Sequence, residues 1–353
     1  MKHLLVPFIW LVAMGCQRAA PPVPAPSGPM TIAVPAEGAY LGSYVDFGET
    51  EDHVTIESID KYESRIGKSL AIVASSSYWG EQTFPLENLR RVTRHGSIPL
   101  IYWSPWDKPY EQEKGPDRFS LKSILEGKWD AYIDQWADGA KAFGQPFFVS
   151  FCNEMNGEWF PWSGHFYGEE KGGPETFKKT WRYVVDRVRA RGAKNIVWVF
   201  HVNNYSEPQD DWNTCAQYYP GSDYVDWLGL SVYGMQFRNQ PAGWAEFRDL
   251  LDYPYQEISQ LDPKKPIMLA EFGVGEFPDS GDKAQWFRDA FAQMPKYPRL
   301  KAAVYWHERW QNADESYSNL RVNSSPHALQ AFREGIANPF WLSAPIYQPV
   351  KKN

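Results

Sequence analysis

The sequence has 353 residues, of which 43% are hydrophobic and 22% charged, and its formal net charge is −7. This length suffices for one large α/β domain or for two ordinary domains, and an acidic chain is not expected to bind nucleic acid. The 17 Trp and 20 Tyr residues are many for a mean hydropathy of −0.53. We therefore expect aromatic rings at binding surfaces as well as in the core.

The N-terminal segment has the pattern of an export signal. The apolar run Leu4–Ala13 is too short to cross a bilayer and has the length of a signal-peptide core. Residues 13–16, Ala-Met-Gly-Cys, resemble a bacterial lipobox in which Cys16 would be acylated. We predict a lipoprotein signal over residues 1–16 and a Pro-rich tether over 17–38. The protein would then be exported, either as an outer-membrane lipoprotein held by its lipid anchor or as an extracellular or periplasmic protein; an ordinary secretory signal is the alternative.

From residue 39 to 342, β-rich runs alternate with stretches of helical periodicity, and residues 343–353 are predicted to form a C-terminal tail. The predicted strands are Tyr40–Val45, Leu70–Ser75, Ile98–Trp103, Phe147–Cys152, Asn195–Phe200, Val225–Tyr233, Pro266–Glu271 and Leu300–Trp306. The predicted helices are Ile56–Ile66, Leu86–His95, Trp129–Phe143, Pro174–Arg191, Ala242–Gln260, Asp282–Met294 and Pro326–Ala337.

This alternation predicts an α/β protein with a single-domain (β/α)8 TIM barrel, because its strands read as buried on both faces. A doubly wound open sheet is the competing fold, but no glycine-rich phosphate loop follows the first strand. In such barrels the chemistry lies at the C-terminal ends of the strands. Polar and aromatic residues gather at those positions: Trp103, Trp106, Asp107, Asn153, Glu154, His201, Asn203, Tyr233, Glu271, Trp306, His307 and Glu308.

Two glutamates in this group suit the hydrolysis of a glycosidic bond. Glu154 and Glu271 end the fourth and seventh predicted strands, from which they can face each other across a barrel mouth. A retaining glycosidase needs one protonated carboxyl group and one carboxylate nucleophile about 5–5.5 Å apart. Tyr233 could donate its phenol to Glu271, or it could pack on the barrel rim.

Four sequence blocks resemble glycoside hydrolase family 26: CNEMNGEWFPW around Glu154, WLGLSVYG around Tyr233, MLAEFG around Glu271 and AVYWHE around Trp306. The similarity in order and spacing extends from about residue 40 to 340. The family consists of retaining (β/α)8 enzymes, chiefly endo-β-mannanases, with β-1,3-xylanases and mixed-linkage β-glucanases. The resemblance implies that Glu154 is the acid/base, Glu271 the nucleophile and Tyr233 its hydrogen-bond partner. It also implies that three tryptophans line the subsites nearest the scissile bond: Trp159, Trp162 and Trp306.

One position departs from the family pattern. The mannanases of the family usually have His before the acid/base, whereas this chain has Asn153. In related barrels an Asn at this position holds the 2-hydroxyl of the sugar, which is axial in mannose and equatorial in glucose and xylose. Because endo-β-mannanases predominate in the family, we predict a retaining endo-β-glycanase that acts on β-1,4-mannan, whereas Asn153 favours a sugar with an equatorial 2-hydroxyl. Mixed-linkage β-1,3-1,4-glucan or xylan is the alternative substrate, and a non-catalytic glycan-binding lipoprotein is the alternative from another class.

The remaining candidates have alternative roles that are structural. His201 is a candidate for substrate binding or for making a structural hydrogen bond. Trp103 and Trp106 are candidates for stacking on a sugar or for packing in the core. Cys152 and Cys215 could form a disulfide, which the sequence alone does not decide. No cofactor and no metal site are expected, and we expect a monomer.

Overall fold

The computed structural model describes residues 29–109, 115–240 and 242–350. The predicted signal peptide and most of the predicted tether lie outside these residues and remain predictions. Residues 30–32, expected in the tether, instead form strand β1 (Met30–Ile32), which pairs antiparallel with β13 (Tyr347–Pro349) from the expected tail. Within the described part of the chain, no helix combines the length and the apolar character needed to span a bilayer.

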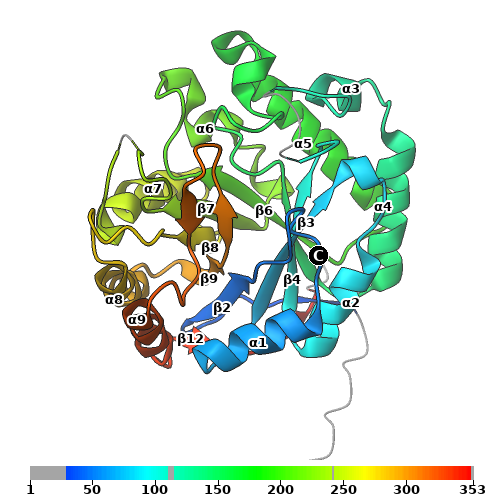
Figure 1. Cartoon of the computed structure of the whole chain (residues 1–353). Helices are drawn as coiled ribbons and strands as arrows, with labels where there is room; N and C mark the ends of the chain where they lie inside the picture. The colour runs from blue at the N-terminus through cyan, green and yellow to red at the C-terminus, as the bar shows by residue number, and fades with distance from the viewer. Residues whose placement is uncertain (1–28, 110–114, 241, 351–353) are drawn as a thin grey trace, which may run out of the picture.

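Eight parallel strands form a closed barrel at the centre of the molecule (Figure 1). They are β2 (Ala39–Tyr44), β3 (Ile72–Tyr78), β4 (Ile98–Ser104), β5 (Phe147–Phe151), β6 (Ile196–Asn203), β7 (Trp227–Tyr233), β8 (Ile267–Gly273) and β9 (Leu300–Trp306). Each strand pairs with the next, and β2 pairs with β9 to close the barrel. The short strand β12 (Trp341–Leu342) pairs parallel with the start of β2, at Ala39 and Tyr40. The predicted (β/α)8 fold is confirmed.

Helices surround the barrel (Figure 1). They are α1 (Ile56–Ile66), α2 (Leu86–His95), α3 (Leu121–Leu125), α4 (Asp130–Phe143), α5 (Gly173–Ala190), α6 (Cys215–Tyr218), α7 (Phe247–Leu261), α8 (Lys283–Gln293) and α9 (Pro326–Ile336). The bounds of α1 follow from its caps: the Thr55 hydroxyl accepts a hydrogen bond from the Ser58 N–H, and Gly67 ends the helix at φ 77°. Helix α7 begins later than predicted because Gly243 is left-handed at φ 66° and the N-cap Glu246 is still extended at ψ 148°.

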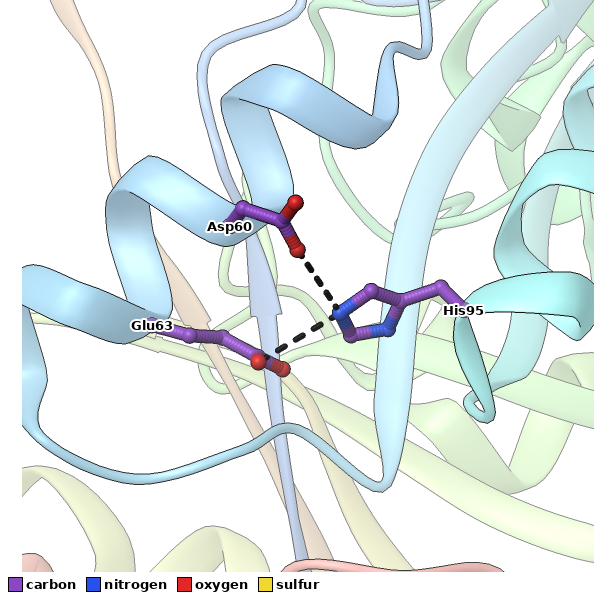
Figure 2. A group of neighbouring side chains, drawn as sticks. All are labelled: Asp60, Glu63 and His95. Atoms are coloured by element: carbon purple, nitrogen blue, oxygen red, sulfur yellow. Dashed lines mark ion pairs between the residues drawn. The ribbon is translucent and has the colours of Figure 1, made fainter.

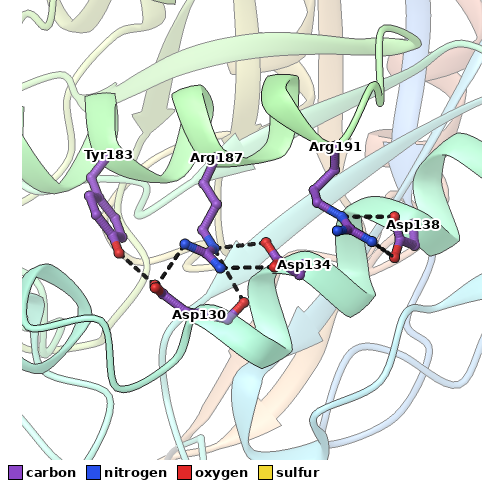
Figure 3. A network of polar contacts seen from close by, with 6 residues as sticks. All are labelled: Asp130, Asp134, Asp138, Tyr183, Arg187 and Arg191. Atoms are coloured by element: carbon purple, nitrogen blue, oxygen red, sulfur yellow. Dashed lines mark hydrogen bonds and ion pairs between the residues drawn. The ribbon is translucent and has the colours of Figure 1, made fainter.

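An ionic network fixes α5 against α4 (Figure 3). Arg187 binds Asp130 at 2.7 Å and Asp134 at 2.7 Å, and Arg191 binds Asp138. The Tyr183 hydroxyl also donates to Asp130. The Arg187 contacts are partly buried and networked, and such contacts hold geometry better than isolated surface pairs. The network thus anchors the two helices on either side of β5, whose C-terminal end carries Glu154.

Candidate active site

A bend in the backbone after β5 places Glu154 at the barrel mouth. Cys152 and Glu154 both have left-handed backbone conformations, with φ of 50° and 54°. Such conformations are unfavourable for residues other than glycine and commonly occur at functional sites. The Glu154 N–H donates to the carbonyl of His201 on β6 at 2.8 Å, which holds the bend in place. The side chain is buried, with 7% of the residue exposed.

Two side chains orient the carboxyl group of Glu154. The indole Nε1 of Trp159 donates to Glu154 Oε2 at 2.7 Å, and the Ser231 hydroxyl on β7 forms a further hydrogen bond to it. Burial raises the pKa of Glu154, and these two hydrogen bonds partly oppose that rise. A carboxyl group with a raised pKa can remain protonated near neutral pH, as a general acid requires.

A bulge in the sheet presents Glu271. On the β7 side the register of β8 skips Ala270, since Leu269 and Glu271 pair with the adjacent Leu230 and Ser231. On the β9 side it shifts between Leu269 and Phe272. The Tyr102 hydroxyl donates to the carbonyl of Ala270 at 2.7 Å. Bulges of this kind redirect a side chain next to an active site. This one aims the buried carboxyl group of Glu271 into the barrel mouth.

Glu271 has a hydrogen-bond donor suited to its anionic form. The Tyr233 hydroxyl donates to Glu271 Oε2 at 2.7 Å. Burial raises the pKa of Glu271 well above its ordinary value, the nearby Glu154 raises it further, and the Tyr233 hydrogen bond lowers it. Two close, buried carboxyl groups titrate as a pair. We infer that they share one proton over a pH range in which isolated carboxyl groups would both be ionised.

The separation of the two carboxyl groups decides which displacement chemistry the site can perform. One carboxylate oxygen of Glu154 and one of Glu271 lie within 4.8 Å of each other and of a His201 ring nitrogen. Retaining glycosidases hold their carboxyl groups about 5–5.5 Å apart, whereas inverting enzymes need about 6.5–9.5 Å to admit a water molecule. The geometry therefore fits direct attack by a carboxylate on a bound sugar.

His201 lies buried behind the two glutamates and does not line the pocket. The residue is fully buried, and its ring nitrogens hydrogen-bond to the hydroxyls of Ser150 at 3.0 Å and Ser231 at 2.7 Å. Burial lowers the pKa of His201 to about 3, so the ring is neutral at ordinary pH. The structure therefore corrects the substrate-binding role proposed for His201, because serines engage both nitrogens. For the same reason the ring offers no free nitrogen to a metal ion between the two glutamates.

A pocket opens beside Glu271, and several of the predicted residues line it. Asn153, Trp162 and Trp306 form part of the wall. Trp162 Nε1 donates to the Asn153 carbonyl at 2.6 Å. Trp306 stacks on Tyr44 with ring centroids 4.2 Å apart, and its Nε1 donates to Glu308 at 2.7 Å. These contacts fix flat aromatic faces next to the nucleophile, as pyranose binding requires.

Trp103 lies on the wrong side of its strand for a sugar to reach. Its fully buried indole stacks on Trp136 of α4 at 4.0 Å and donates to the Tyr132 hydroxyl at 3.1 Å. Successive side chains of a strand point to opposite faces. Tyr102 points into the barrel, so Trp103 faces the helices, and the proposed stacking role of Trp103 is wrong.

Sequence reasoning missed several residues of the pocket. They are Glu51, Ser76, Tyr78, Tyr102, Ser104 and Phe160, whereas Trp106, a candidate for stacking on a sugar, also lines the pocket. Glu51 accepts hydrogen bonds from the hydroxyls of Ser76 at 2.6 Å and Tyr78 at 3.2 Å. Burial and the charge of Glu51 raise the pKa of Glu308 to about 8. The serines and Tyr78 lie on strands recognised from the sequence, but no pattern indicates that Glu51 folds inward from its loop.

Comparison with known proteins agrees with this geometry. The family model for glycosyl hydrolase family 26 matches residues 116–290. Over 319 residues the chain is 30% identical to endoglucanase H of Acetivibrio thermocellus. This alignment covers 87% of this chain and 32% of that protein. It is 28% identical to a mannan endo-1,4-β-mannosidase of Bacillus subtilis, with 67% of this chain and 59% of the relative covered.

The barrel also resembles solved structures. A family 26 β-mannanase from Bacteroides ovatus superposes with a TM-score of 0.63 at 19% identity, covering 87% of this chain and 90% of that one. This likeness concerns the fold. Together the matches place the molecule among the glycoside hydrolases built on a (β/α)8 barrel.

The chain belongs to glycosyl hydrolase family 26. It spans 32% and 59% of the lengths of the two curated relatives named above.

Cys152 and Cys215 are both buried and unbonded. Burial raises the pKa of both thiols, so neither is expected to react as a thiolate. The disulfide considered from the sequence is absent from this structure.

Proposed function

We propose that this chain is a retaining endo-β-glycanase. The observation that carries the proposal is the pair of buried carboxyl groups of Glu154 and Glu271, whose nearest oxygens lie within 4.8 Å beside an aromatic-walled pocket. A non-catalytic glycan-binding protein would not require two carboxyl groups at this separation. Nor would it require a tyrosine hydroxyl donating to one of them.

In the first step, the Glu271 carboxylate attacks the anomeric carbon of the sugar in the pocket. Glu154 gives its proton to the glycosidic oxygen, so that the C–O bond breaks and the leaving chain departs as an alcohol. The Tyr233 hydroxyl holds the attacking carboxylate in place through its hydrogen bond to Oε2. The product is a glycosyl ester of Glu271.

In the second step, the ionised Glu154 takes a proton from a water molecule, which attacks the same carbon and releases Glu271. The donated hydrogen bonds of Trp159 and Ser231 stabilise the anion that Glu154 becomes between the two steps. Glu154 thus alternates between acid and base, and the anomeric configuration is inverted twice.

We propose β-1,4-mannan as the substrate, with mixed-linkage β-1,3-1,4-glucan as a second candidate. Relatives named mannan endo-1,4-β-mannosidase support the first. The second is favoured by Asn153, which lines the pocket next to the acid/base, and by the relative named endoglucanase, whose alignment covers 87% of this chain. The two polymers differ at the 2-hydroxyl, so the side chain at position 153 lies where they can be distinguished.

Hydrolysis of galactomannan, mixed-linkage glucan and xylan by the wild type and by Asn153→His tests both proposals. We expect the wild type to release oligosaccharides from mannan or glucan. We expect Asn153→His to change the ratio of kcat/KM for these two polymers by about 10-fold or more, since one misplaced buried polar contact costs about 1–3 kcal/mol. Asn338→His, at an exposed position after α9, is the control and should leave the ratio unchanged. No hydrolysis of any of these polymers would favour the glycan-binding alternative.

A further inference from the structure

A second group of potential metal ligands lies on the outer surface of the barrel, away from the proposed active site. Asp60 and Glu63 are three residues apart on α1, and His95 is the last residue of α2 (Figure 2). One ligand atom from each side chain lies within 4.8 Å of the other two. The group is near the starts of β3 and β4, at the end of the barrel opposite the strand ends that carry Glu154 and Glu271.

The hydrogen bonds around His95 define which ring nitrogen carries a proton. The Ser97 hydroxyl gives its single hydrogen to the Leu70 carbonyl at 2.7 Å. It must therefore accept the hydrogen bond that joins it to His95 Nδ1 at 3.0 Å, which makes Nδ1 the protonated nitrogen. In the neutral ring, Nε2 then carries a lone pair, and it faces the carboxylates of Asp60 and Glu63 (Figure 2).

The distances from Nε2 to the two carboxylates are long for direct hydrogen bonds. They are 3.6 Å to Asp60 Oδ1 and 3.3 Å to Glu63 Oε2, whereas an N–H···O bond is typically about 2.7–3.2 Å. Ligands held about 2.0–2.2 Å from a tetrahedral Zn²⁺ are separated by about 3.3–3.6 Å. The two distances from His95 Nε2 match those between ligands of one ion, and the Asp60 and Glu63 oxygens lie within 4.8 Å of each other.

The backbone of Leu70 orients two of the three ligands. Its N–H donates to Glu63 Oε1 at 2.7 Å, which leaves Oε2 directed at His95, and its carbonyl binds the serine that holds His95 Nδ1. Ligands of metal ions are usually fixed by such outer hydrogen bonds, and a ligating histidine donates its other N–H to one. The Glu63 and His95 side chains are 14% and 10% exposed, while that of Asp60 is 63% exposed and can adjust to an ion.

We propose that Asp60, Glu63 and His95 bind a divalent transition-metal ion of the Zn²⁺ class, with water completing the coordination. An imidazole with two carboxylates suits Zn²⁺ better than Mg²⁺ or Ca²⁺, which prefer oxygen ligands throughout. The ion would link α1 to α2 at the end of the barrel where residues serve stability. No local sequence pattern indicates this site, because its ligands come from two helices and His95 has no histidine or cysteine close to it in the sequence.

The competing account is an ion pair, in which a doubly protonated His95 lies between the two carboxylates without a metal. To separate the two, the full chain is freed of metal with a chelator and titrated with ZnCl₂ at pH 7.5 by calorimetry. Its melting temperature is measured in parallel. Asp60→Asn and His95→Gln each remove one ligand, and Asp60→Asn changes an exposed side chain that folding should tolerate. His165→Gln is the matched control, because His165 pairs with a single surface carboxylate, Glu169, at 3.1 Å.

We expect one Zn²⁺ per chain and a melting temperature about 5 °C higher at 100 times the dissociation constant. Co²⁺ in place of Zn²⁺ should give the visible absorption of a four-coordinate site. Asp60→Asn and His95→Gln should lose both responses, and His165→Gln should keep them. The proposal is overturned if 100 µM Zn²⁺ neither binds nor stabilises the wild type. It is equally overturned if both ligand variants respond as the wild type does, since the ion would then lie elsewhere.

Discussion

Replacing Glu271 with glutamine is expected to lower kcat on a β-glycan by on the order of 10⁴-fold or more, because loss of a nucleophile removes the covalent route altogether. Glutamine keeps the size of the side chain and can still hydrogen-bond to the Tyr233 hydroxyl that donates to Glu271. The amide cannot attack the anomeric carbon. The measurement is the initial rate of reducing-sugar release at saturating substrate.

The same variant should fold normally. Burial and the charge of Glu154 raise the pKa of Glu271 in the folded chain above its unfolded value. Ionisation therefore favours the unfolded state, and the stability linked to this group is lost as pH rises through the folded-state pKa. We expect Glu271→Gln to melt at or above the wild-type temperature near neutral pH. Glu276→Gln, a carboxyl group that accepts from Ser324 outside the pocket, is the activity control. Turnover by Glu271→Gln close to that of Glu276→Gln would remove Glu271 from the mechanism.

Replacing Glu154 with glutamine is expected to have an effect that depends on the leaving group. On natural glycans, kcat/KM should fall by about 10²–10⁴-fold, the usual contribution of a general acid. On aryl glycosides with activated leaving groups the first step needs no proton, so its rate should fall far less. Equal losses on both substrate types would contradict the assignment of Glu154 as the acid.

The pH dependence of kcat/KM tests the role of Glu154 as the acid in a second, independent way. Burial raises the pKa of Glu154, and the acid must be protonated to act. Wild-type kcat/KM on a glycan should therefore decline as pH rises through that raised pKa. Glu154→Gln has no proton to lose at this position, so its profile should lack this alkaline decline.

The strands of the barrel could be predicted from the sequence because short apolar runs bounded by polar residues are typical of buried β-strands. The predicted strand Phe147–Cys152 differs from β5 by one residue, since Cys152 already belongs to the left-handed bend. Helix α7 was misplaced at its start because helical periodicity does not reveal that Gly243 adopts a positive φ. The pairing of β1 with β13 joins segments more than 300 residues apart, which no local pattern shows.

Residues of the proposed site could be predicted where their position along a strand determines the direction in which the side chain points. Tyr233 ends β7 and Glu271 lies two residues before the end of the neighbouring β8, and the structure joins them by a hydrogen bond. The stacking role predicted for Trp103 is wrong because side chains alternate along β4, so that Tyr102 points into the barrel and Trp103 packs against α4. Glu51 was missed because it enters the pocket from a loop, where direction is set by turns rather than by periodicity.

The central claim, double displacement at Glu154 and Glu271, is tested most directly by the stereochemistry of the first product. The polymer that the enzyme cleaves fastest is hydrolysed in deuterated buffer, and anomeric proton signals are followed by NMR before mutarotation. Carboxyl groups within 4.8 Å predict that the new reducing end appears first as the β-anomer. Initial appearance of the α-anomer would show single displacement by water and would contradict the account.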